Sequence, residues 1–330
     1  MATESDLIKQ RLMKRFGSLY NHICSMENLL LADMLASKGK SKQKGVIRHK
    51  QYQEAELTAL RTILVNKQFK TSSYTTFKIY EPKERLVYRL PYYPDRIVQH
   101  AIMNVLEPYF LSIFTADTYS CIKGKGIHGA VRAVKRALKD KEGTTYCLKL
   151  DIRKFYPSVN HEVLKELLRR KFKDQDLLHL LDGIIDSAEG LPIGNYLSQY
   201  LANFYLSYFD HWLKECKAVR YYFRYADDMV ILSSNKEALQ KLLQEIRKYL
   251  YTNLRLIVKD NYQVFPVDAR GIDFLGYRFY HDYTLLRKSI KQNFARMLAT
   301  HPTRESIAGY TGWAKHCNSK HLLKKLKIKL

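Results

Sequence analysis

The stretch FRYADDMVIL, residues 223–232, places two aspartates in the middle of a run of aromatic, β-branched and aliphatic residues. Such a run favours two short strands, with Asp227 and Asp228 at the tight turn between them. Aspartate is a common turn residue because it hydrogen-bonds its own backbone and tolerates water. Two adjacent carboxylates also suit a bound cation, since they repel each other unless they are neutralised. The stretch therefore predicts a β-hairpin whose turn is either solvated or binds a metal ion.

A third aspartate lies far upstream and ends another predicted strand. The segment TYCLKLDI, residues 145–152, has the composition of a buried strand, and Asp151 lies at its end. An aspartate there is often only a turn former or a helix cap. If this strand neighbours the hairpin, however, Asp151, Asp227 and Asp228 converge at one sheet edge. Carboxylate oxygens suit Mg²⁺, and two such ions would support an in-line phosphoryl transfer.

Predicted helices and strands are interleaved along the chain without regular alternation. The periodicity predicts helices over residues 5–36, over 51–68, over 96–110 with an end near Pro108, after a cap at Asn160, over 197–214 and over 236–251. It predicts strands within 74–96, 145–152, 223–232, 254–259 and 272–280. A doubly wound parallel sheet would need a regular strand and helix alternation, so the predicted fold class is α+β.

A strong positive charge indicates a polyanionic partner. The 330 residues carry 56 Lys and Arg against 32 Asp and Glu, a formal net charge of +24. This excess favours nucleic acid, since phosphates are neutralised by Lys and Arg. The basic segment 38–50 holds six of these residues and is predicted to be an exposed loop, either a solvated linker or a phosphate-contacting arm. No apolar run reaches the length of a membrane helix, which predicts no membrane partner.

The N-terminal sequence and the cysteines indicate a reducing compartment. The first residues lack the apolar core and cleavage site of a secretory signal. None of the five cysteines forms a C-x-x-C pair, so neither a disulfide framework nor a zinc site is expected. The predicted location is the cytoplasm.

Four segments together resemble the palm of reverse transcriptases. LKLDIRKFYPSVNHEVL and RYADDMVIL resemble the two carboxylate motifs, and FLGYRF (274–279) resembles the hairpin that grips a primer end. In GLPIGNYLSQ (190–199), Ile193 stands where most of these enzymes have glutamine, and Ser198 and Gln199 follow. This pattern is similar to reverse transcriptases of diversity-generating retroelements. EPKER, PDRIVQHAI, YSCIKGKGIHGA, GKSKQK and GYTGWAKHCNSKHL also resemble that family and extend the likeness over nearly the whole chain.

The resemblance implies an RNA-directed DNA polymerase whose metal site is formed by the aspartates. Asp151, Asp227 and the main-chain carbonyl of Ile152 would bind two Mg²⁺ ions, for which Mn²⁺ could substitute, with Asp228 as a further metal-site residue. Lys259 would protonate the pyrophosphate leaving group, unless it is a solvated basic residue.

Further residues would bind the incoming deoxynucleoside triphosphate and the primer. Lys83 and Arg85 match residues that contact the triphosphate, although Arg89 is close to the same register. Tyr156 would exclude a ribose 2′-hydroxyl by its bulk, unless it is an ordinary core aromatic. The resemblance places these further contacts on Ile193, Gly194 and Gln199 for the nucleotide and on Phe274, Leu275, Gly276 and Tyr277 for the primer grip.

The aliphatic side chain of Ile193 has a consequence of its own. Glutamine could hydrogen-bond nucleotide and template groups, whereas isoleucine only fills space, so geometry checking should weaken. In the family this position is associated with misincorporation opposite template adenines.

The family organisation implies a right-hand polymerase. The expected parts are an N-terminal helical extension with a basic loop at 1–70, fingers at 71–145, a palm with an antiparallel sheet at 146–282, including finger-side helices at about 158–190, and a small helical thumb at 283–330. Residues 284–330 contain eleven Lys or Arg and one acid, as expected for a thumb that holds a duplex backbone. The implied partners are template RNA, cDNA, deoxynucleoside triphosphates and a small basic pentameric accessory protein, in a bacterial or phage setting.

Two other functions fit parts of the sequence. Another bacterial reverse transcriptase, from a retron, a group II intron or a phage-defence system, would share the aspartates but not the pattern at Ile193. A non-catalytic RNA-binding or chaperone protein would explain the charge without explaining the three aspartates.

Overall fold

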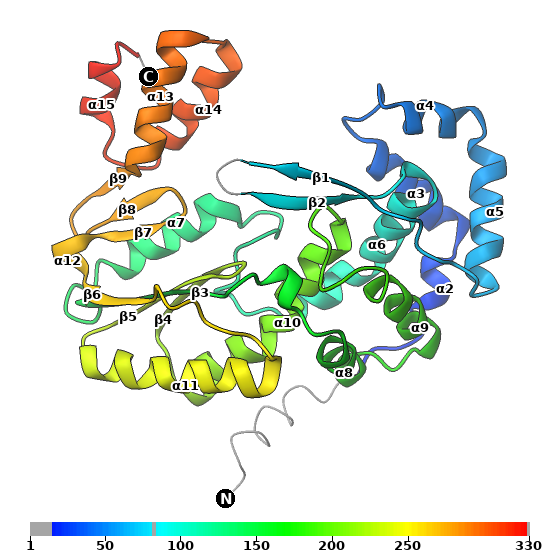
Figure 1. Cartoon of the computed structure of the whole chain (residues 1–330), viewed down its shortest axis with the longest axis horizontal. Helices are drawn as coiled ribbons and strands as arrows, with labels where there is room; N and C mark the ends of the chain where they lie inside the picture. Colours follow the sequence, from blue (N-terminus) through cyan, green and yellow to red (C-terminus); the bar gives the residue numbers. More distant parts are fainter. Residues whose placement is uncertain (1–14, 81–83, 329–330) are drawn as a thin grey trace, which may run out of the picture. The chain divides into compact units, whose positions relative to one another are not determined.

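The computed structural model describes residues 15–80 and 84–328, which form two compact units. Of the described residues, the first unit comprises 15–80, 84–115, 154–216 and 250–256, and the second comprises 116–153, 217–249 and 257–328. Helices and antiparallel sheets are mixed in the described residues, which confirms the α+β class (Figure 1). No helix in the described ranges is long and apolar enough to cross a membrane.

The first unit is mainly helical. Its helices are α2 (Tyr20–Ile23), α3 (Met26–Ser37), α4 (Lys44–Gln51), α5 (Gln53–Val65), α6 (Ile97–Ile113), α8 (His161–Lys171), α9 (Gln175–Ile185) and α10 (Tyr196–His211). Strands β1 (Thr75–Ile79) and β2 (Arg85–Arg89) pair as an antiparallel hairpin. Helix α6 packs against both α3 and α10. The rings of Phe110 and Phe204 meet edge to face at 5.6 Å between α6 and α10, in the apolar core of this unit.

The second unit is built on a four-stranded antiparallel sheet. Its strand order is β4-β5-β3-β6, from β3 (Tyr146–Asp151), β4 (Tyr221–Tyr225), β5 (Asp228–Ser233) and β6 (Gln263–Pro266). Helices α7 (Gly126–Ala137) and α11 (Lys236–Leu254) lie on opposite sides of this sheet (Figure 1). Residues Cys147, Val230 and Phe265 on one sheet face share a core with the buried side of α7. Alternation along β3 and β5 thus gives the sheet a packed face on which the aspartates also lie.

The C-terminal part of the second unit continues this core. A short helix α12 (Val267–Arg270) leads to the three-stranded sheet of β7 (Ile272–Phe274), β8 (Tyr277–Phe279) and β9 (Thr284–Leu286). Three helices follow, α13 (Lys288–Thr300), α14 (Arg304–Ala314) and α15 (Lys320–Lys325). Phe294, Ala314 and Leu323 from these helices are buried in the same core as Phe274 and Tyr277.

Three predictions about helices and loops of the first unit differ from the structure. The helix predicted over 5–36 is interrupted at Ser25, whose side chain accepts from Asn28 N at 3.2 Å and caps α3, and residues 5–14 lie outside the described residues. The predicted loop at 38–50 contains α4, because Val46 and His49 on one helix face are buried. Helix α6 continues through Pro108 to Ile113, since the buried apolar face extends past the proline to Phe110.

Candidate active site

A two-residue turn between β4 and β5 positions Asp227. Tyr225 pairs with Asp228 in the antiparallel register, which leaves Ala226 and Asp227 as the connection. Ala226 has a φ of +54°, a left-handed conformation that needs support from its surroundings. The fully buried Arg224 donates from Nη1 to the carbonyl oxygen of Ala226 at 3.1 Å and from Nη2 to Thr118 Oγ1 at 3.3 Å. A buried guanidinium therefore holds the turn that presents the aspartate.

Pairing of β3 with β5 brings the three aspartates together. Asp151 lies directly opposite Asp228 in the antiparallel register, and Asp227 precedes Asp228 in the turn. Opposite residues of an antiparallel pair lie on the same face with short separations between their Cβ atoms. The predicted convergence at one sheet edge is thus present within the second unit.

Burial and neighbouring carboxylates disfavour the ionised forms of Asp227 and Asp228. Burial raises the pKa of Asp227 to about 6, and the Asp151 carboxylate adds to the rise through its charge and a hydrogen bond. Burial likewise raises the pKa of Asp228 to about 6, against the opposing charge of Lys149. Buried oxygen atoms Oδ1 of Asp151 and Oδ1 of Asp228 have no hydrogen-bond partner among the described residues. Burial and mutual repulsion thus outweigh the positive charge beside these carboxyl groups.

Two lysines compensate the aspartates in part. Lys259 Nζ lies 2.7 Å from Asp151 Oδ2, and Lys149 Nζ lies 3.7 Å from Asp228 Oδ1. Lys149 also donates to the carbonyl oxygen of Asp273, the middle residue of β7. The lysine at position 149 was not predicted as a site residue. The period of two along LKLD could have found it, because Lys149 and Asp151 must then share a sheet face.

The donor set fits a divalent ion whose coordination is completed by a substrate. Among the described residues, no group of three or more His, Cys, Asp or Glu side chains could hold a metal ion by itself. Mg²⁺ is usually bound through one or two carboxylates together with substrate phosphates and water. Asp151 and Asp227, with Asp228 beside them, supply carboxylate oxygens of that kind.

The chain beside Asp151 is fixed by backbone pairing. The predicted strand 254–259 is reduced to one isolated bridge, between Val258 and the buried Ile152. The Lys259 N–H donates to the Asp151 carbonyl oxygen at 2.9 Å. Thus Lys259 is fixed beside Asp151 by both its backbone and its side chain.

The predicted primer-grip residues form the β7–β8 turn. Leu275 and Gly276 connect the strands with φ values of +52° and +80°, as a tight hairpin with both central residues left-handed requires. A Cβ atom on Gly276 would lie 2.4 Å from the Trp313 ring, so the close packing there needs glycine. Phe274 and Tyr277 are fully buried, so their side chains serve the core.

The remaining predicted residues lie in the first unit, except Lys83, which falls outside the described residues. Arg85 begins β2 and is exposed. Tyr156 begins a single 3₁₀ turn, Tyr156–Ser158, and is half-buried. Ile193 and Gly194 lie in the loop before α10, and Gln199 is a half-buried residue of that helix. Within this unit, the loop contacts both the Tyr156 turn and β2.

Comparison with known proteins identifies the family. Residues 78–279 match the model of the family described as reverse transcriptase (RNA-dependent DNA polymerase). The chain is 28% identical to Protein YkfC of Escherichia coli (strain K12) over 277 residues, which cover 69% of this chain and 71% of that protein. It is 26% identical to the Retron Ec83 reverse transcriptase of Escherichia coli over 215 residues, which cover 60% of this chain and 66% of that protein.

A solved structure shows the same fold at lower sequence identity. The apo telomerase of Candida tropicalis matches with a TM-score of 0.50 and 12% identity, covering 64% of this chain. The chain spans about half of that telomerase chain, 48% of its length. Members of the matched family use divalent metal ions, in agreement with the donor set at Asp151 and Asp227. The chain therefore belongs to the reverse transcriptase (RNA-dependent DNA polymerase) family, with a domain of the bacterial retron and group II intron type, and the predicted polymerase fold and enzyme class are confirmed.

Proposed function

We propose that this chain is the reverse transcriptase of a diversity-generating retroelement, which copies template RNA into cDNA with errors at template adenines. The observation that carries the polymerase reaction is the pairing of Asp151 with Asp228 beside Asp227, where the buried Oδ1 atoms of Asp151 and Asp228 accept no hydrogen bond from the described residues. The family match over residues 78–279 supports the same reaction. The error specificity rests on Ile193 and on the sequence pattern around it.

In the second unit, the aspartates would bind the metal ions and Lys259 would donate a proton. Asp151, Asp227 and the Ile152 carbonyl would hold two ions, Mg²⁺ or Mn²⁺ in its place, and Asp228 would support this site from the opposite strand. When bound, such ions would activate the primer 3′-hydroxyl and stabilise the pyrophosphate leaving group. Lys259 Nζ would then protonate the pyrophosphate, and the β7–β8 turn would hold the primer end.

The substrate roles in the first unit are also proposals. Tyr156 would exclude the ribose 2′-hydroxyl, and Arg85 with Lys83 would contact the triphosphate. Gly194 has a φ of +118°, and a Cβ there would lie 2.4 Å from the Tyr88 carbonyl oxygen, so the loop that carries Ile193 passes close to β2. Gln199 would support this loop from the first turn of α10. We expect the polymerase parts to follow the fingers, palm and thumb boundaries predicted from the sequence.

The biological setting completes the proposal. The +24 charge favours template RNA and cDNA as polyanionic partners, and a small basic pentameric protein would assist their binding. We propose a bacterial or phage origin and a cytoplasmic location, in keeping with the bacterial relatives.

Primer extension on an RNA template tests the polymerase reaction. The wild-type chain with Mg²⁺ and deoxynucleoside triphosphates should synthesise cDNA. Asp227→Ala should lower the rate by about three orders of magnitude or more, because the catalytic groups act as a unit. Asp182→Ala, which removes an aspartate of α9, is the matched control and should keep the rate within about twofold. Equal synthesis by wild type and Asp227→Ala would discredit the assignment.

Sequencing of the cDNA tests the retroelement type. Ile193→Gln restores the side chain that most of these enzymes carry and should lower misincorporation at template adenines while synthesis stays measurable. An unchanged adenine error rate in this variant would refute the role of Ile193. Wild-type errors that show no preference for adenine would instead favour a retron or group II intron enzyme.

A further inference from the structure

The loop between α9 and α10 joins the turn of Tyr156 to the strand β2. The Leu191 N–H donates to the Tyr156 carbonyl oxygen at 2.8 Å, and the Tyr88 N–H donates to the Ile193 carbonyl oxygen at 2.8 Å. Both contacts lie within the first unit, on either side of Pro192. A displacement of this loop must therefore disturb the Tyr156 turn, β2 or both.

The packing leaves the loop little freedom to shift at its N-terminal end. Gly190 has a φ of +59°, and a Cβ atom there would lie 2.4 Å from the Tyr156 carbonyl oxygen and 2.7 Å from Pro157. Contacts this short exclude any side chain at position 190 without movement of the backbone. The peptide of Gly190 thus sets the distance between the loop and the residue proposed to select deoxynucleotides.

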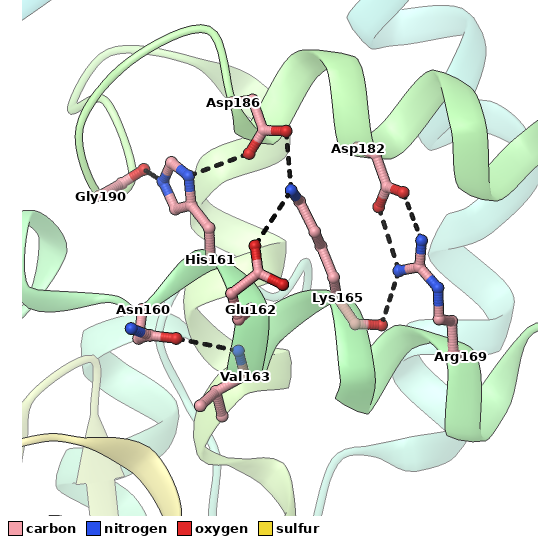
Figure 2. A network of polar contacts seen from close by, with 9 residues as sticks. All are labelled: Asn160, His161, Glu162, Val163, Lys165, Arg169, Asp182, Asp186 and Gly190. Carbon is pink, nitrogen blue, oxygen red and sulfur yellow. Dashed lines mark hydrogen bonds and ion pairs between the residues drawn. The ribbon is translucent and has the colours of Figure 1, made fainter.

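His161 holds that peptide from the other side. Its Nε2 lies 2.8 Å from the Gly190 carbonyl oxygen, which can only accept, so Nε2 carries the donated hydrogen. Its Nδ1 lies 3.2 Å from Asp186 Oδ1, at the end of α9 where the loop begins. One imidazole therefore contacts both ends of the segment 186–190 (Figure 2).

The position of the His161 backbone is itself fixed. Asn160 caps α8 by accepting from Val163 N at 3.0 Å, which sets the first turn of the helix on which His161 lies. Lys165 Nζ lies 2.7 Å from Asp186 Oδ2 and 3.6 Å from Glu162. Burial alone would raise the pKa of the Asp186 carboxyl, but Lys165 and His161 lower it below its ordinary value. Asp186 is thus a charged anchor for the imidazole.

We propose that His161 is a positioning residue, which holds the loop of Ile193 against the Tyr156 turn and thereby sets sugar and base selection. The inference rests on the proposed function, since it assigns selection to Tyr156 and Ile193. His161 contacts the loop through the Gly190 peptide and acts through it. Its loss leaves the aspartates of the second unit unchanged in sequence and charge, so selectivity should change more than the rate of synthesis.

The test compares His161→Ala, His161→Gln and Arg169→Ala in the full chain. Arg169 lies on the same helix, where its guanidinium pairs with Asp182 of α9 and donates to the Lys165 carbonyl oxygen at 3.1 Å (Figure 2). The ratio of kcat/KM for a deoxynucleotide to that for the matching ribonucleotide should fall about threefold to tenfold in His161→Ala, mainly through KM, as expected for the loss of the hydrogen bond to the Gly190 peptide. His161→Gln keeps an N–H donor at similar reach and should stay nearer to wild type. Arg169→Ala should leave the ratio unchanged.

Hydrogen exchange gives a readout that does not need polymerase activity. The amides of Leu191 and Tyr88 should exchange faster in His161→Ala than in wild type, and at the wild-type rate in Arg169→Ala. Unchanged exchange at both amides, or an unchanged selectivity ratio in an active His161→Ala enzyme, would overturn the positioning role. A wild-type chain that makes no cDNA would count against the proposed function, and the exchange rates would still decide the role of His161.

Discussion

The aspartates of the α8–α9 region and those of the β3–β5 region have opposite electrostatic environments. Asp174 accepts from the backbone N–H groups of Leu19 and Tyr20 at 2.6 and 2.9 Å and from Leu177 N at 3.2 Å. Partial burial opposes ionisation of Asp174, yet these donors lower its pKa below the ordinary value. Asp227 and Asp228 have pKa values raised to about 6 by burial, and Asp151 raises that of Asp227 further. The donors around Asp174 outweigh its burial, whereas Lys149 and Lys259 compensate only part of the negative charge in the second region.

This difference separates carboxylates whose ionised form stabilises the fold from carboxylates whose ionised form is stabilised only when a ligand binds. A carboxylate supplied with backbone or side-chain donors contributes to stability when it is ionised. Buried carboxylates with raised pKa values cost stability when ionised and are a common feature of functional sites. The comparison therefore predicts that removal of an aspartate charge changes stability in opposite directions in the two regions.

The largest effect should come from Asp174. Asp174→Ala leaves the N–H groups of Leu19, Tyr20 and Leu177 without their acceptor and should lower the free energy of unfolding by about 2 to 3 kcal/mol. Because its folded pKa is lowered, this contribution is present above the unfolded pKa and is lost as the pH falls through the folded pKa. Urea unfolding at neutral and acidic pH measures both statements.

Asp182→Ala on the same helix is the matched control. Its partner Arg169 has 45% of its side chain exposed, and ion pairs of this kind contribute about 0 to 1 kcal/mol. Equal losses of unfolding free energy in Asp174→Ala and Asp182→Ala would show that the backbone donors around Asp174 contribute no more to stability than the ion pair of Asp182 does.

A smaller loss is expected at Lys149. Lys149→Met removes the cation nearest to Asp228 and the donor to the Asp273 carbonyl, and should lower the free energy of unfolding of the metal-free chain by about 1 to 2 kcal/mol at neutral pH. Lys165→Met makes the same substitution beside Asp186, which is 50% exposed, and should cost about 0.5 kcal/mol. Added Mg²⁺ should recover part of the loss at Lys149 only. No recovery, with equal losses at both sites, would remove the distinction between the regions.

Much of the site could be predicted because short local patterns specify it. The strand that ends at Asp151, the hairpin at Asp227 and the cap at Asn160 depend on neighbours within a few residues, and the structure contains all three. The register that sets Asp151 opposite Asp228 depends on which strands pair. The convergence of the aspartates was therefore predicted only on the condition that the two strands are neighbours.

The residues that were missed act over long sequence separations. Arg224 lies within RYADD, and its guanidinium is buried and donates to Thr118, 106 residues away along the chain. The helix α4 within the predicted basic loop depends on burial of His49 between Asp33 and Glu56, with Nδ1 2.5 Å from Glu56 Oε2. No local periodicity reports such partners, since tertiary contacts override composition in both cases.

The smallest effect should have the opposite sign and arises at Asp228. Its pKa is raised to about 6 in the folded chain, so the fold favours the protonated form, and ionisation withdraws stability as the pH rises from about 4 through about 6. Asp228→Asn removes that cost but also the ion pair with Lys149, and should therefore stabilise the metal-free chain by a net of about 1 kcal/mol at pH near 8, with the gain vanishing near pH 4. Unfolding in the presence of a chelator across this pH range measures the gain. An equal gain at both ends of the pH range would assign the gain to packing, because the effect of a charge must change as the group titrates.

Divalent ions should reverse the order of stability of wild type and Asp228→Asn, because they should stabilise wild type more than the variant. Asp174→Ala, in contrast, should respond to the same ions as wild type does. Together, these two responses would show that, of the two regions compared, the β3–β5 carboxylates are the ones that bind divalent ions.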